Sequence, residues 1–319
     1  MMRGPVCVVL AALVGVTAGA GAARADDGSG PDAASVLARA GRAARTVAFR
    51  GTVEVRWLDG TGREHTVSLG VRGGDGALDL GASASAGAFV VWGGPARSAS
   101  PPPLVAKYRL RSEAGPSVVD RPTTALQLWE DGQLAEVMDM DVATGLVLRR
   151  QQLDRAGHAV RSVTFVALTL DDGGTMPHPS PLRVTASRHV RAPLRAPARL
   201  GGGYDLIGTY KRGAVVQALY SDGVHTLSLF EQQGRLDPGV LPAGGEAVSV
   251  GRWSATRYTW PGGQVVTWSP GSKATIVCVG DDLAPDVLAA ARSLGPLPTP
   301  PSGVLGRLRR AAHDIAGLV

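Results

Sequence analysis

Residues 47–71 read VAFRGTVEVRWLDGTGREHTVSLGV, and this stretch indicates the class of the fold. In its first half the apolar positions share one parity and the polar positions share the other: Val47, Phe49, Val53, Val55 and Trp57 against Arg50, Thr52, Glu54 and Arg56. Such alternation is typical of a strand with one face toward a core and one toward water. Asp59-Gly60 predicts a tight turn, and Val67, Leu69 and Val71 repeat the pattern on a return strand.

A helix and further antiparallel strands are expected to complete one large sheet. Residues 34–47 have apolar side chains at three- and four-residue spacings, with Ser35 as the cap. Further strands are expected at 88–92, 104–110, 125–129, 134–140, 146–153 and 160–170, with connections at 93–103, 113–116, 131–132, 143–145 and 155–157. Because no long helices alternate with these strands, a doubly wound parallel sheet is excluded. The sequence predicts an α+β fold: a large, curved antiparallel sheet packed on a helix.

A second, smaller unit is expected after a linker. Residues 171–199 hold five prolines and little periodicity, which is typical of a linker. Strands then follow at 204–210, 215–220, 224–230, 247–250, 255–260, 264–268 and 274–279. Asp282 is expected to cap a helix over 283–294, in which Pro285 is tolerated in the first turn.

Residues 1–25 resemble a targeting segment. Arg3 precedes an apolar run, and Ala23-Arg24-Ala25 suits signal peptidase, so cleavage is predicted after Ala25. An uncleaved anchor is the alternative, but a membrane span needs about 18 or more apolar residues and this run is shorter. The mature chain is therefore expected outside the cytoplasm, in the periplasm or on the cell-envelope side, or secreted.

Charge and cysteine content narrow the function. The 319 residues carry a formal net charge of +6, and loss of Arg3 and Arg24 lowers it to +4, which argues against nucleic acid as a partner. Cleavage also removes Cys7 and leaves Cys278 without an intramolecular disulfide partner. Since Cys278 lies in an apolar strand, we expect a buried, inert thiol.

Three groups of motifs resemble the MucB/RseB family of sigma-E regulatory proteins. Residues 34–51, ASVLARAGRAARTVAFRG, resemble the family's opening helix and its aromatic-x-Gly-x-aliphatic strand. The run TGLVLRR at 144–150, with Val163-Thr164-Phe165, resembles the closing strands of its large domain, and Tyr220-Ser221-Asp222-Gly223 with 228–230 resembles the Ser-Asp-Gly hairpin of its small domain. The resemblance spans about residues 34–294. The chain departs from the family at 134–141, LAEVMDMD, and by its tail at 295–319.

The resemblance implies a domain layout, a fold and a function. The large domain at 26–170 would be a half-barrel similar to the lipoprotein carriers LolA and LolB, and 200–294 would be the small domain. The implied function is an exported regulator that binds the extracytoplasmic part of an anti-sigma factor and senses a lipid or lipoprotein ligand of envelope stress. The alternative is a lipid or lipoprotein carrier or scavenger of the cell envelope. A second domain favours the regulator, since a carrier needs only the half-barrel.

Two sets of binding residues are predicted. The apolar face of a strongly curved sheet is either filled by side chains or open to an apolar ligand. Candidates for a cavity are Val53, Val55, Trp57, Val67, Leu69, Trp92, Met138, Met140 and Phe165, with ordinary core packing as the alternative at each. The candidate partner-binding hairpin of the small domain comprises Ser221, Asp222, Gly223, Ser228 and Phe230.

No motif for catalysis, metal or cofactor binding is recognised. No two histidines have the three- or four-residue spacing of ligands on one helix face, and neither a Gly-x-Ser-x-Gly elbow nor a phosphate loop occurs. Asp139 and Asp141 are interpreted as a solvated hairpin end, with a paired-carboxylate site as the alternative. We expect a protein that is not an enzyme.

The C-terminal tail is expected to form a short basic amphipathic helix after a Pro-rich spacer. Its apolar face would hold Leu305, Leu308, Ala312, Ile315 and Val319, with Arg307, Arg309, Arg310 and His313 elsewhere. Such a helix could contact an anionic membrane surface or a partner, and a frayed or back-docked terminus is the alternative.

Overall fold

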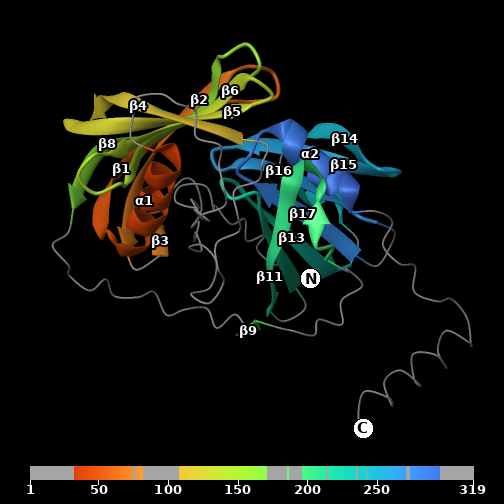
Figure 1. Ribbon diagram of the computed structural model, residues 1–319. Helices are drawn as coiled ribbons and strands as arrows, with labels where there is room; N and C mark the ends of the chain where they lie inside the picture. The colour runs from red at the N-terminus through yellow and green to blue at the C-terminus, as the bar shows by residue number, and fades with distance from the viewer. Residues whose placement is uncertain are drawn as a thin grey trace, which may run out of the picture.

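The computed structural model describes residues 32–74, 77–81, 108–170, 185–186, 196–212, 215–234, 236–241, 243–270 and 274–294. The predicted signal segment, Trp92, most of the predicted linker and the amphipathic tail lie outside these residues. Within them, none of the helices has the length and hydropathy of a membrane-spanning segment. The described chain forms two antiparallel sheets, which lie side by side in Figure 1. This confirms an α+β fold without a parallel doubly wound sheet.

The first sheet has eight strands in the order β3-β2-β1-β8-β7-β6-β5-β4. Helix α1 precedes it, and α1 lies along one face of the sheet in Figure 1. The bounds are α1 (Ala33–Thr46), β1 (Phe49–Leu58), β2 (Glu64–Gly74), β3 (Ala77–Gly81), β4 (Tyr108–Val118), β5 (Arg121–Glu130), β6 (Gln133–Asp141), β7 (Val147–Leu153) and β8 (Ala159–Leu170).

The β1–β2 hairpin confirms the two strands and the turn that were predicted for residues 47–71. The two strands pair from Phe49 opposite Gly73 to Leu58 opposite Glu64, around the expected turn. Gly51 sits where β1 approaches β8 closely, because a Cβ there would lie 2.3 Å from the carbonyl oxygen of Ala167. The ring of Phe49 packs edge-on against Phe165, with centroids 5.5 Å apart. The aromatic-x-Gly motif therefore serves close packing of β1 against β8.

Helix α1 begins one turn earlier than its expected cap implied. Asp32, rather than Ser35, is the N-cap, since its carboxylate accepts the backbone N–H groups of Ala34 and Ser35. Arg39 donates hydrogen bonds to the carbonyls of Val142 and Ala143, which ties the helix to the β6–β7 turn. The apolar face of α1 packs into a core cluster that extends across the sheet: Ala33, Leu37, Ala40, Tyr108, Leu110, Leu126, Leu128, Met138, Met140 and Val224.

Two expectations for the first sheet are wrong. The connection predicted at 113–116 lies within β4, and the chain turns instead at Val119 and Asp120, which both have positive φ. Asp139 and Asp141 do not form a solvated end, because they are 0% and 1% exposed. Arg149 donates to Asp139 at 2.5 Å, whereas Asp141 accepts two bonds from Arg121. Strand parity alone could not reveal these ion pairs, since each joins neighbouring strands.

The second sheet is also antiparallel, with the order β10-β11-β12-β13-β17-β16-β15-β14. The short strand β9 (Thr185–Ala186) pairs with β11 beside this order. The strands are β10 (Arg199–Leu200), β11 (Tyr204–Arg212), β12 (Val215–Ser221), β13 (Thr226–Gln233), β14 (Glu246–Val250), β15 (Trp253–Trp260), β16 (Gly263–Trp268) and β17 (Ala274–Gly280). Short 3-10 turns occupy Gly201–Gly203 and Pro238–Val240.

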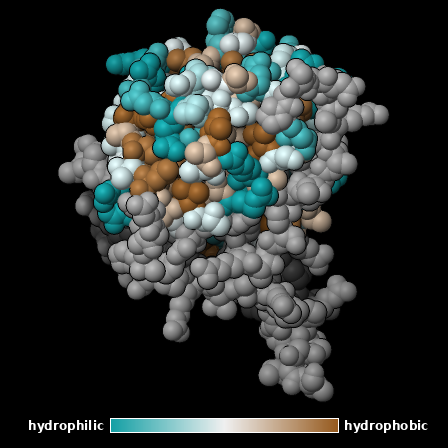
Figure 2. Space-filling view, turned by 60° about the vertical axis from the view of Figure 1, so that its left-hand side comes forward, coloured by the Kyte–Doolittle hydropathy of each residue, from teal (hydrophilic) through white to brown (hydrophobic). Residues whose placement is uncertain are grey.

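Helix α2 (Ala284–Ser293) follows β17 and closes the second core. Pro285 stands in its first turn as expected, but the N-cap is Leu283, and Asp282 accepts the backbone N–H of Leu283 at 2.7 Å. Cys278 is fully buried in β17, which confirms the expected buried thiol, and burial raises its pKa to about 12. In the surface view, hydrophobic and hydrophilic side chains are mixed over the described residues in sight (Figure 2).

Candidate functional site between the two sheets

A row of polar side chains stands at one end of the core face of the first sheet. On β6, Glu136 shares the parity of the buried Met138 and Met140; on β7, Arg150 and Gln152 continue the parity of Leu148. On β8, Arg161 likewise precedes Val163 and Phe165. The strand register places Glu136 opposite Gln152 and Gln152 opposite Arg161. The row is buried, with 1% to 7% exposure: Glu136, Arg150, Gln152 and Arg161.

The second sheet presents two acidic segments at the same place. The β12–β13 turn begins with Asp222, whose Oδ1 accepts the backbone N–H groups of Val224 and His225 at 2.9 and 2.7 Å. Gly223 gives this turn its positive φ of 94°. At the end of β17, Asp281 accepts the N–H of Thr226 at 2.6 Å, which holds the junction with α2 against the start of β13.

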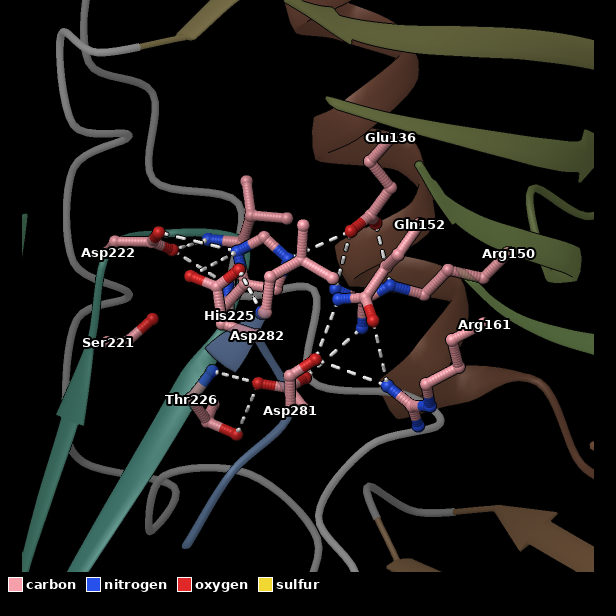
Figure 3. Close-up of polar contacts among 12 residues, drawn as sticks. Glu136, Arg150, Gln152, Arg161, Ser221, Asp222, His225, Thr226, Asp281 and Asp282 are labelled. Carbon is pink, nitrogen blue, oxygen red and sulfur yellow. Dashed lines mark hydrogen bonds and ion pairs between the residues drawn. The ribbon is translucent and has the colours of Figure 1, made fainter. Parts of the chain in front are cut away.

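Hydrogen bonds and ion pairs cross from one sheet to the other. Arg150 donates bidentately to Glu136 on its own sheet and also to Asp281, at 3.1 Å. Gln152 donates to the carbonyl of Asp281 at 2.7 Å, and Arg161 to that carbonyl at 3.1 Å. Figure 3 shows these side chains converging from both sheets. Together with Tyr108, Asp222, His225 and Asp282, we call Glu136, Arg150, Gln152, Arg161 and Asp281 the inter-sheet cluster.

His225 lies at the centre of the inter-sheet cluster and is 3% exposed. Its Nε2 is 2.8 Å from Glu136 of the first sheet, and its Nδ1 is 3.3 Å from Asp222 and 3.5 Å from Asp282. Burial by itself lowers the pKa of His225, but the surrounding carboxylates outweigh burial and raise it well above the ordinary value. Burial likewise opposes ionisation of Glu136, yet Arg150 and His225 hold the pKa of Glu136 at about 2.

Apolar packing reinforces the polar contact. Val224, which follows the turn glycine of the second sheet, is fully buried in the core cluster that α1 forms with the first sheet. Tyr108 of β4 belongs to the same cluster, and its hydroxyl donates to Asp222 at 2.8 Å. Trp260 at the end of β15 packs against the other core cluster of the first sheet. A continuous buried contact therefore joins the two sheets.

The predicted cavity residues divide between two core clusters. Val53, Val55, Trp57, Val67, Leu69 and Phe165 pack in one, whereas Met138 and Met140 pack with α1 in the other. Except for Trp57 and Val67, which are partly buried, these side chains are buried. Their role in lining a ligand cavity stays a prediction.

The predicted partner-binding hairpin lies in the inter-sheet contact. Ser221, Asp222 and Gly223 are buried at its turn, Ser228 is 6% exposed on β13, and Phe230 is partly buried. In the described structure this turn contacts the first sheet of the same chain. A role in binding another protein stays a prediction. The tail residues Leu305, Arg307, Leu308, Arg309, Arg310 and Ile315 lie outside the described residues.

Sequence reasoning missed most of the inter-sheet cluster, although a signal was present. A charged or amide side chain at a core-facing position on three consecutive strands marks a buried polar contact, because an unpaired charge in a core is strongly unfavourable. Histidine spacing alone does not reveal a site in which one imidazole stands beside two carboxylates. Asp222, His225 and Asp282 offer ligand atoms within 4.8 Å of one another.

Fold and site together define the class: an α+β protein of two antiparallel sheets, each with a packed helix, joined by a buried ion-paired contact. No family model and no curated protein sequence matches the chain. Among solved structures, it is similar to the Pseudomonas aeruginosa MucA/MucB complex, with 20% identity and a TM-score of 0.46 over 82% of this chain and 98% of that one.

Two further MucB structures are similar to the chain. One is MucB in complex with MucA(peri), with 20% identity and a TM-score of 0.44, covering 82% of this chain and 98% of that one. The other is MucB, with 19% identity and a TM-score of 0.46, covering 82% and 96%. All three of these solved structures contain MucB.

Proposed function

We propose that the chain is an exported, non-catalytic regulator that binds the extracytoplasmic part of an anti-sigma factor and thereby modulates sigma-factor signalling. The proposal takes residues 26–170 and 200–294 as two domains, with 171–199 as their linker and 295–319 as a tail. It also takes the first domain as a LolA/LolB-like half-barrel that senses a lipid or lipoprotein. The motifs at 34–51, 144–165 and 220–230 support this assignment, together with the order of helix, first sheet, second sheet and terminal helix.

The inter-sheet cluster is the observation that carries the regulatory part of the proposal. A regulator must convey a signal from one unit to the other, and a ligand can do so only by binding one arrangement of the units better than another. The contact between the sheets depends on charges such as Arg150 and Asp281, which must be paired while they are buried. A ligand that separates the sheets returns these charges to water, so separation is less costly than opening an apolar core of the same area.

The test measures binding of the mature chain, beginning at Asp26, to the extracytoplasmic segment of the single-span protein encoded beside a sigma-factor gene in the same genome. Isothermal titration calorimetry should give a stoichiometric complex, and addition of a diacylated lipopeptide should weaken it. Native mass spectrometry of the purified chain would identify retained acyl chains. Retained acyl chains without affinity for the segment would favour the carrier instead. If the chain neither retains acyl chains nor binds the segment, both assignments are wrong.

A further inference from the structure

Three side chains at the centre of the inter-sheet cluster have the geometry of a metal site. The Nδ1 atom of His225 lies 3.3 Å from Oδ2 of Asp222 and 3.5 Å from Oδ2 of Asp282. A tetrahedral Zn²⁺ ion has bonds of about 2.0–2.2 Å to imidazole nitrogen and carboxylate oxygen, which places neighbouring ligand atoms about 3.3–3.6 Å apart. Both distances from the imidazole therefore fit a four-coordinate ion as they stand.

The imidazole is oriented in the way that metal-binding histidines usually are. Its other nitrogen, Nε2, lies 2.8 Å from Oε2 of Glu136, and Arg150 fixes that carboxylate by a bidentate contact. A carboxylate that accepts from the distal nitrogen holds the ring and leaves the proximal nitrogen for the ion. Here the carboxylate comes from the first sheet and the three ligands come from the second.

The ligating carboxylates have outer partners of their own. The hydroxyl of Tyr204 donates to Oδ2 of Asp282 at 2.7 Å, and the hydroxyl of Tyr108 donates to Oδ2 of Asp222 at 2.8 Å. Tyr108 also lies 3.1 Å from Nδ1 of His225, so its hydroxyl adjoins two of the three ligands. Such outer hydrogen bonds fix ligand orientation in metal sites.

Charge provides an observation independent of these distances. The inter-sheet cluster holds four carboxylates but only two guanidinium groups, and each of these residues is less than 10% exposed: Glu136, Asp222, Asp281, Asp282, Arg150 and Arg161. Carboxylates therefore outnumber guanidinium groups by two around His225. Buried carboxylates are favourable only with cations or hydrogen bonds nearby, so these surroundings suit a divalent cation better than an anion.

We propose that His225, Asp222 and Asp282 bind a divalent transition-metal ion of the Zn²⁺ class at the contact between the sheets. Imidazole nitrogen with carboxylate oxygen suits such ions better than Ca²⁺ or Mg²⁺, which prefer oxygen ligands alone. Because Glu136 and Tyr108 of the first sheet support the ligands, the ion would stabilise the joined arrangement of the two sheets. The inference is independent of the proposed binding of an anti-sigma factor.

The test uses the full chain, unfolded in urea with EDTA, refolded and dialysed before Zn²⁺ is added. We expect one Zn²⁺ per chain by calorimetry and elemental analysis, and a rise in Tm of about 5–10 °C at 100-fold excess over Kd. Asp282→Asn should weaken Zn²⁺ binding at least about 10-fold and, at the same Zn²⁺ concentration, reduce the rise in Tm to about half or less. Asp154→Asn is the matched control, because Asp154 forms an exposed pair with His158 at 3.6 Å, and it should change neither result.

A second measurement needs no variant. Co²⁺ bound to the parent chain should show the visible absorption of a four-coordinate ion, and Zn²⁺ should displace it in a one-to-one ratio. If the chain takes up neither ion stoichiometrically, or if Asp282→Asn binds Zn²⁺ as tightly as the parent, the proposal is wrong and the inter-sheet cluster is an ion-paired contact alone.

Discussion

Arg150 is the side chain on which the contact between the sheets depends most directly. It pairs with Glu136 at 2.6 Å and with Asp281 at 3.1 Å, and the three side chains are 6%, 2% and 2% exposed. Arg150→Met keeps most of the volume but leaves both carboxylates buried without their guanidinium partner. Removing one partner of a buried ion pair costs about 3–5 kcal/mol. We expect the free energy of unfolding to fall by about that amount.

Urea denaturation followed by circular dichroism measures this loss. With an m-value of about 3 kcal/mol per molar urea, the midpoint should fall by about 1–1.7 M. Arg56→Met is the matched control, because Arg56 pairs with Glu54 at 2.7 Å but is 56% exposed. Its midpoint should stay unchanged within error, since exposed ion pairs contribute little.

The outcome for Arg150→Met separates two descriptions of the contact. A midpoint shift below about 0.3 M, equal to roughly 1 kcal/mol at that m-value, would refute the argument that Arg150 is desolvated between the two sheets. A transition that splits into two steps would support it, because the sheets would then unfold independently.

Three further predictions follow from the described residues. Val224→Ala should lower the free energy of unfolding by about 1–3 kcal/mol in urea denaturation, because Val224 is fully buried in the core cluster around α1. Val166→Ala is the control: Val166 is 53% exposed, and its loss should change the free energy of unfolding by no more than about 0.5 kcal/mol. The pKa of Asp141 is lowered because Arg121 and Thr144 outweigh burial, so its contribution is complete above about pH 4 and is lost as pH falls; Asp141→Asn should flatten the acid side of a plot of urea midpoint against pH. Cys278 should resist iodoacetamide at pH 8 in the native chain and react after denaturation, as peptide mass spectrometry would detect; native labelling would contradict its burial.

The local alternation of apolar and polar residues was sufficient to predict most strands of both sheets. The alternation around Asp59-Gly60 predicted β1 and β2 because side chains on a strand point to opposite faces, and a register shift by one residue would expose the core. It failed at residues 113–116, where glycine and proline indicated a turn although β4 continues past them. The edge position of β4 explains why the strand continues there, since an edge strand tolerates a proline that a central strand would not.

The inter-sheet cluster marks the limit of what the sequence determined. By itself the sequence determined the alternation, most of the hairpin turns, the two groups of strands and the parity that Glu136 and Arg150 share with core residues. Only the tertiary structure decided that Glu136 and His225, 89 residues apart, lie 2.8 Å from each other. The physical reason is that periodicity reports which face of a strand a residue occupies, whereas charge pairing between two sheets depends on how those faces meet in space.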